Sequence, residues 1–133
     1  MTQEEKIQYW INISDNDLKV AGIMLDNNQY LYTCFMCQQA IEKIFKGCFA
    51  KLKEEQQPHI HNLIKLAERS NIYELLSEEQ KSFIDILNPF NIEARYPDYK
   101  KKMAKDLTGS IAQNILTQTE NLQKWTKEKI LFQ

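Results

Sequence analysis

The chain of 133 residues carries 17 basic and 18 acidic residues, for a formal net charge of −1. This length suits one domain, residues 1–133, with room for a hydrophobic core. The charge balance lacks the basic excess of a dedicated nucleic-acid-binding protein. No apolar run approaches the ~18 to 20 residues that span a bilayer, and the N-terminal MTQEEKIQYW is too acidic for a signal peptide. Three cysteines are an odd number without framework spacing, which indicates a reducing compartment. We therefore expect a cytoplasmic protein, and the lack of a long apolar run predicts no membrane contact.

Helical periodicity governs the first half of the chain. Apolar and small residues recur at steps of three and four over residues 4–26, which predicts a long helix with one face toward a core. A second helix is predicted over residues 29–54. Its apolar face is wide, which is typical of a central helix with several neighbours. Pro58 forbids its simple continuation.

The second half predicts two shorter helices and one long helix. A short helix is expected over residues 61–70. Another begins at Ser77, where Ser-Glu-Glu-Gln has the pattern of a capping box, and it stops near Asn88-Pro89. The last helix is predicted over residues 101–130, with Gly109 inside it as a weakness of ~1 kcal/mol.

No stretch alternates between apolar and polar residues as a half-buried strand does. Three long and two short helices therefore predict an all-α fold, an antiparallel bundle in which the short pair forms an elaborated crossing.

One motif with redox or zinc spacing is Cys34-Phe-Met-Cys37. A redox CxxC relies on a helix N-terminus to lower the pKa of its first thiol, whereas both cysteines fall well inside a predicted helix. No second CxxC or CxxH pair completes a zinc tetrahedron. The pattern favours buried packing residues.

A second motif is His59-Ile-His61, whose spacing suits a metal site only if further ligands come from elsewhere. Nothing in the sequence indicates those ligands. The pattern favours a loop histidine followed by a helix N-cap region, so we expect no metal site and no cofactor.

The most chemically suggestive stretch is NIEARYPDYKKK, residues 91–102. Arg95 just before a helix can grip a phosphate or carboxylate, and free N–H groups at a helix start attract anions. Tyr96 and Tyr99 offer ring faces for a base, and Lys101 lies in a run that attracts phosphate. The structural alternative has Arg95 paired with a carboxylate and the lysines simply solvated. Residue chemistry alone does not separate these readings.

Taken together, the segments resemble the HEPN domain family of higher eukaryotes and prokaryotes. The resemblance rests on three motifs in order: QQAIEK at residues 38–43, HNL at residues 61–63 and RYP at residues 95–97. It covers nearly the whole chain, and these further positions agree with it: Tyr9, Trp10, Asp17, Leu18, Ala21, Cys37 and Leu66.

The resemblance implies an up-and-down bundle of four to five helices that is commonly a symmetric homodimer. Many HEPN proteins are encoded beside a minimal nucleotidyltransferase and form a toxin–antitoxin or related two-component system with it. Others are metal-independent ribonucleases, which resemble one another in an arginine and a histidine separated by four to six residues. After Arg95 this chain has no histidine at such a distance, so the proton-transfer group is missing. Catalysis is therefore not expected at this motif.

These observations favour a non-catalytic HEPN protein that binds a nucleotide or an RNA phosphate and partners a minimal nucleotidyltransferase. Its expected contacts are Arg95, Tyr96, Tyr99, Lys101, His61 and Asn62. One alternative is a ribonuclease with a displaced catalytic group. The other is a pure dimerisation or interaction module, in which RYP and HNL only stabilise the bundle.

The second predicted helix gives a physical reason to expect a homodimer. Apolar residues lie on nearly all sides of its start, at positions 30–32, 35 and 36. A small bundle can leave part of this surface exposed, and such a patch marks an association surface.

Overall fold

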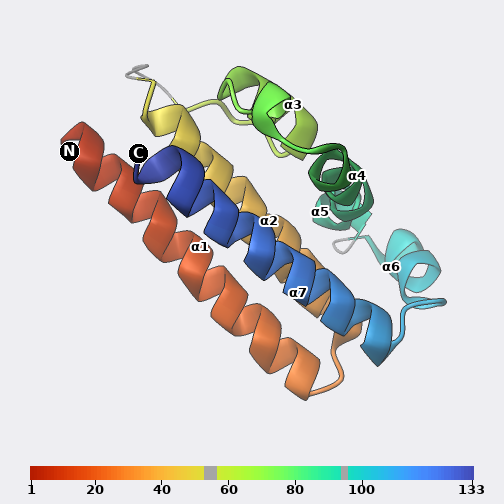
Figure 1. Ribbon diagram of the computed structural model, residues 1–133. Helices are drawn as coiled ribbons and strands as arrows, with labels where there is room; N and C mark the ends of the chain where they lie inside the picture. The colour runs from red at the N-terminus through yellow and green to blue at the C-terminus, as the bar shows by residue number, and fades with distance from the viewer. Residues whose placement is uncertain (53–56, 94–95) are drawn as a thin grey trace.

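The computed structural model describes residues 1–52, 57–93 and 96–133, and Figure 1 shows three long helices running side by side. They are α1 (Gln3–Asp26), α2 (Tyr30–Ala50) and α7 (Gly109–Thr126). The described residues form helices, turns and connections without a β-strand, which confirms the all-α prediction. None of the described helices combines the length and apolar character needed to cross a lipid bilayer.

The first two helices form an antiparallel pair. Thr2 starts α1 with a capping box in which its hydroxyl accepts a hydrogen bond from Glu5 N and the Glu5 carboxylate accepts one from Thr2 N. Asn28 then adopts a positive φ of 60°, a conformation that asparagine tolerates better than most residues, and the chain reverses there. Within the pair, the buried Ser14 hydroxyl donates to Ala40 O at 2.6 Å. Small side chains at this crossing let the helices approach closely.

The core is organised around α2, as its wide apolar face predicts. Fifteen of its 21 residues are buried, so this helix contacts α1 on one side and α7 and the short helices on others. Ile41, Ile44 and Phe45 are fully buried. Each contributes roughly 1.5–3 kcal/mol relative to an exposed position.

Several short helices lie along the side of the bundle that faces away from α1 (Figure 1). They are α3 (Leu63–Arg69), the 3₁₀ turn η1 (Tyr73–Leu75), α4 (Glu78–Leu87), α5 (Phe90–Glu93) and α6 (Pro97–Ala104). The capping box predicted at Ser77 is confirmed, because Gln80 N donates to Ser77 Oγ at 3.1 Å and Ser77 N donates to Gln80 Oε1 at 2.8 Å.

The prediction of one long last helix is wrong. The helix is interrupted between Ala104 and Gly109. Thr108 caps α7 there by accepting a hydrogen bond from Ile111 N at 3.2 Å. A threonine side chain that bonds the backbone in this way competes with helix continuation. Gly109 is thus the first residue of α7 rather than an interior weakness. The helix then runs into a π-helical turn, η2 (Lys127–Leu131).

The second predicted helix also differs at its end, since α2 stops at Ala50 rather than running to residue 54. Residues 53–56 lie outside the described part of the chain.

Candidate functional site

The sequence-predicted site residues lie at two places along α2. His61 and Asn62 precede α3, beside the middle of α2, whereas Tyr96 and Lys101 belong to the start and body of α6, which contacts the beginning of α2. Arg95 lies outside the described residues, and so does the side chain of Tyr99.

The separation of the two places follows from the helix itself. His61 contacts Glu42, and Lys100 of α6 contacts Tyr32. These two α2 residues are ten positions apart, which corresponds to roughly 15 Å along the helix axis. The two groups of residues therefore do not converge on a single phosphate, although an extended ligand can span them.

At the middle of α2, Glu42 is the centre of a buried ionic cluster. Its side chain is 2% exposed, and its Oε2 lies 3.2 Å from Lys46 Nζ and 3.4 Å from Lys43 Nζ. Its Oε1 lies 3.1 Å from His61 Nδ1. Burial by itself raises the pKa of Glu42, but the two lysines and the hydrogen bonds from His61 and Lys46 outweigh it and hold the pKa below its ordinary value. Glu42 is therefore a satisfied carboxylate.

The His61 ring presents itself to solvent from this cluster. Its side chain is 54% exposed, while Gln38 Nε2 fixes the backbone by donating to His61 O at 3.1 Å. Among the described residues, Nε2 of the ring has no hydrogen-bond partner. A carboxylate that orients one nitrogen of an imidazole leaves the other poised to give or take a proton. The arrangement is chemically competent for acid–base work, and sequence spacing gave no sign of it.

Asn62, by contrast, has a structural role. Its Oδ1 caps α3 by accepting hydrogen bonds from Ile64 N at 3.0 Å and Lys65 N at 3.1 Å. The next amide, Leu63 N, donates to Asn88 Oδ1 at 2.8 Å. The expected contact of Asn62 with a ligand stays a prediction.

The polar residues of the QQAIEK motif tie α2 to α5. Gln39 Nε2 donates to Gln38 Oε1 at 2.7 Å and to Asn91 Oδ1 at 3.1 Å. Lys43 Nζ donates to Gln39 Oε1 at 2.9 Å, which joins this amide chain to the Glu42 cluster. We call the whole network, Gln38, Gln39, Glu42, Lys43, Lys46, His61 and Asn91, the polar network of α2.

Asp17 of α1 borders this network with a buried carboxylate oxygen, Oδ2, that has no hydrogen-bond partner among the described residues. Burial raises the pKa of Asp17, with Glu42 adding to the rise and Lys43 opposing it. A carboxylate in this position costs stability at neutral pH.

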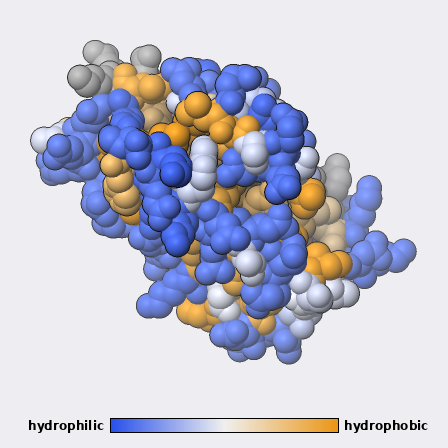
Figure 2. Space-filling model, in the orientation of Figure 1, coloured by the Kyte–Doolittle hydropathy of each residue, from blue (hydrophilic) through white to orange (hydrophobic). Residues whose placement is uncertain are grey.

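The lysines of α6 have a different environment. Lys101 and Lys102 are exposed, and neither forms an ion pair with any described residue. Lys100 donates to the Tyr32 hydroxyl and its Nζ lies 4.6 Å from the Tyr32 ring centroid. Tyr96 is the N-cap of α6 and is 55% exposed. This end of the molecule lies to the right in Figures 1 and 2, where hydrophilic side chains project from the surface.

Two further expectations concern cysteine and metal. Cys34 and Cys37 are fully buried free thiols, and burial raises the pKa of each to about 12, which confirms their assignment as packing residues. Among the described residues, no three histidine, cysteine, aspartate or glutamate side chains are grouped so that they could hold a metal ion.

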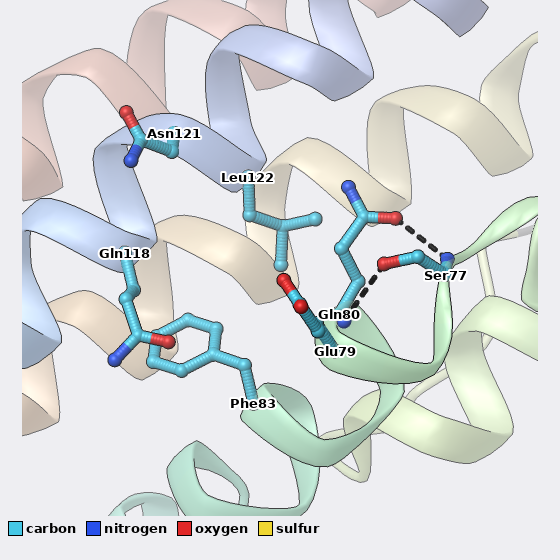
Figure 3. Close-up of a pocket in the computed structure, with 7 residues that line it drawn as sticks. All are labelled: Ser77, Glu79, Gln80, Phe83, Gln118, Asn121 and Leu122. Atoms are coloured by element: carbon cyan, nitrogen blue, oxygen red, sulfur yellow. Dashed lines mark hydrogen bonds between the residues drawn. The ribbon is translucent and has the colours of Figure 1, made fainter.

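A groove between α4 and α7 is lined by five polar residues together with Phe83 and Leu122 (Figure 3). Two of its polar residues, Ser77 and Gln80, bond each other in the capping box of α4, as the dashed lines in Figure 3 show. Part of its polar lining therefore serves the helix start.

Sequence reasoning did not select Glu42, Lys46, Tyr32 or Lys100 as site residues. A signal for the first two was present, because Glu42 and Lys46 are charged residues four positions apart within an apolar helix. The other pair is separated by 68 positions, and only the docking of α6 brings it together.

Comparison with known proteins agrees with the helical fold. The family model described as "HEPN domain" matches residues 7–130. The crystal structure of TT1696 from Thermus thermophilus has a similar fold, with a TM-score of 0.78 and 23% sequence identity over 93% of this chain and 98% of that one. A search of functionally curated proteins finds no match. Since the family model spans nearly the whole chain, the protein belongs to the HEPN domain family.

Proposed function

We propose that this HEPN protein binds the phosphate groups of a nucleotide or RNA on α6 and acts without catalysing a reaction at that helix. The observation that carries the proposal is the uncompensated charge of residues 97–106, where four lysines face two aspartates in a chain of net charge −1. Lys101 and Lys102 are exposed cations without a carboxylate partner in the described structure. Such cations attract phosphate and release counterions when it binds.

The binding test uses a short labelled RNA and the double variant Lys101→Ala/Lys102→Ala. We expect weaker binding and a fall of about one in the slope of log affinity against log salt for each lysine that contacts phosphate. The matched control is Lys19→Ala/Lys124→Ala, which removes the same charge from exposed positions on α1 and α7. An equal loss of RNA affinity in both double variants would show that only net charge matters, and it would exclude α6 as the binding site.

Arg95 remains a predicted contact on the strength of the sequence. Calorimetric titration of ATP and GTP into the wild-type protein and the Arg95→Ala variant tests it. Equal binding by both proteins excludes Arg95 from the site.

The proposed partners are a second copy of this chain and a minimal nucleotidyltransferase, as the family resemblance implies. At the start of α2, Phe35 and Met36 are half-buried apolar side chains, which supports an association surface. Light scattering that gives a monomer at micromolar concentration would count against the dimer. A reading frame for a small nucleotidyltransferase next to the gene would support the two-component role.

A second candidate function is a ribonuclease with a displaced catalytic group. The His61–Glu42 pair favours it, because a carboxylate-oriented imidazole at the surface can remove the proton of an RNA 2′-hydroxyl as that oxygen attacks phosphorus. The bond from phosphorus to the 5′-oxygen of the next nucleotide breaks in this step, and that oxygen leaves with a proton from water. Transfer RNA incubated with EDTA is the assay. Cleavage that His61→Ala abolishes and His59→Ala preserves would establish this activity, since His59 is the other histidine and is also exposed. Absence of cleavage by the wild type would exclude it.

A further inference from the structure

A hollow of about 270 Å³ lies where the α1–α2 turn meets α6. Its rim and floor combine two tyrosines, two amides, one lysine and apolar side chains: Asn28, Gln29, Tyr30, Leu31, Tyr32, Lys100, Ala104 and Leu107. We call it the tyrosine pocket. It adjoins Lys101 and Lys102, which are proposed above to bind phosphate, because Lys100 of the same helix lines it.

One wall of the tyrosine pocket is held in place by local structure. The Tyr30 hydroxyl donates to Asn28 Oδ1 at 3.1 Å, across the turn that the positive φ of Asn28 creates. A Cβ atom added at Gly109 would come within 2.9 Å of the Tyr30 hydroxyl, so Tyr30 lies directly against the start of α7. The ring of Tyr30 is therefore positioned before any ligand arrives.

The other wall joins an aromatic ring to a cation. Tyr32 is 36% exposed, its hydroxyl accepts from Lys100, and the lysine Nζ lies 4.6 Å from the ring centroid. Leu31, which is 7% exposed, adds apolar surface to the lining. Aromatic surface, amides and a positive charge thus meet in one concavity.

We propose that the tyrosine pocket receives a base of single-stranded RNA whose phosphates lie on the α6 lysines. A base has a flat face for a tyrosine ring and polar edges for the Asn28 and Gln29 amides, and stacking on aromatic side chains beside a basic surface is how proteins hold single strands. A free phosphate ion would not form favourable contacts with the apolar side chains of the pocket. Bases of a duplex are stacked inside it and do not reach such a pocket. This inference deepens the proposed function and rests on it.

The test compares two fluorescein-labelled oligonucleotides of equal length, one of RNA and one abasic with the same number of phosphates. We expect the wild-type protein to bind the RNA at least about fivefold more tightly, because only the RNA can stack. Tyr32→Ala should lower RNA affinity to that of the abasic strand and leave abasic binding unchanged. Tyr32→Phe, which keeps the ring, should stay within about twofold of the wild type.

The matched control is Tyr9→Ala, which removes another exposed tyrosine, 47% exposed, near the opposite end of α1. It should leave both affinities unchanged. Equal binding of the two strands by the wild type, with loss in the α6 lysine double variant, would overturn the tyrosine pocket and retain the proposed function. A Tyr32→Ala variant that still prefers RNA would also overturn the pocket. Failure of the wild type to bind either strand would overturn the proposed function and the pocket with it.

Discussion

The middle of α2 and the body of α6 both carry charged residues, but they use them in opposite ways. In the polar network of α2, Glu42 is buried, paired with the cations of Lys43 and Lys46, and within hydrogen-bond distance of His61. On α6, Lys101 and Lys102 reach into solvent without a counter-charge among the described residues. Buried charge must be paired to be tolerated, whereas an exposed unpaired charge costs little and remains available to a ligand. The first region therefore serves mainly the scaffold, and the second is the region that we propose for binding.

The largest effect that would sharpen this contrast is expected from Glu42→Ala. The substitution leaves the largely buried charges of Lys43 and Lys46 without their carboxylate partner. We therefore expect the free energy of unfolding to fall by about 3 kcal/mol. Guanidinium chloride unfolding followed by circular dichroism measures it. Glu68→Ala, at an exposed position on α3, should change stability by less than about 0.5 kcal/mol. Similar losses in both variants would break the contrast.

The same carboxylate gives the stability a defined pH dependence. Because the folded-state pKa of Glu42 is lowered, its contribution is present above the ordinary value of 4.5 and is lost as the pH falls through the folded-state value. The stability advantage of the wild type over Glu42→Gln should therefore be full at neutral pH and shrink below pH 4.5. An advantage that is constant with pH would show that charge is not its source.

A middle-sized effect is expected from Asn62→Ala, since the variant loses the cap of α3. The cost should be about 1 kcal/mol of unfolding free energy. If Asn62 serves only the scaffold, RNA affinity of the folded variant will stay that of the wild type. A loss of affinity at unchanged stability would instead move Asn62 into the ligand site.

The smallest effect, and one of opposite sign, is expected from Asp17→Asn. The raised pKa of Asp17 means that its negative charge is disfavoured in the folded state, at a cost present at neutral pH and absent once the group is protonated in both states. The variant should gain up to about 1 kcal/mol at neutral pH. The gain should vanish in acid, below the ordinary pKa of 3.8. A loss of stability at neutral pH would show that Asp17 supports the polar network of α2.

Local signals in the sequence were sufficient for much of the fold. The capping box at Ser77 and the apolar period of α1 lead directly to the observed helices. The interruption between α6 and α7 was not predicted, because Leu107, Ile111 and Ile115 continue the apolar period across it. Thr108, a good N-cap residue, was the signal for it. Periodicity indicates which face of a helix is apolar, whereas a capping residue determines where the helix begins.

The candidate site depended more heavily on tertiary structure. Tyr96 and Lys101 were selected from local chemistry and do lie on one short helix. His61 was selected as well, but its bond to Glu42 joins residues 19 positions apart and requires α3 to dock on α2. The tyrosine pocket needs the α1–α2 turn, α6 and the start of α7 together. No periodicity or motif within one segment encodes such an arrangement.

The interruption at Thr108 also bears on how this protein can change over generations. Because α6 is not a continuation of α7, a substitution on α6 need not transmit helical strain into the three long helices that hold most of the core. The lysine-bearing surface can then vary in charge and shape while the cooperativity of global unfolding stays the same. The binding that we propose for α6 and the stability of the fold can then change separately within one helical bundle.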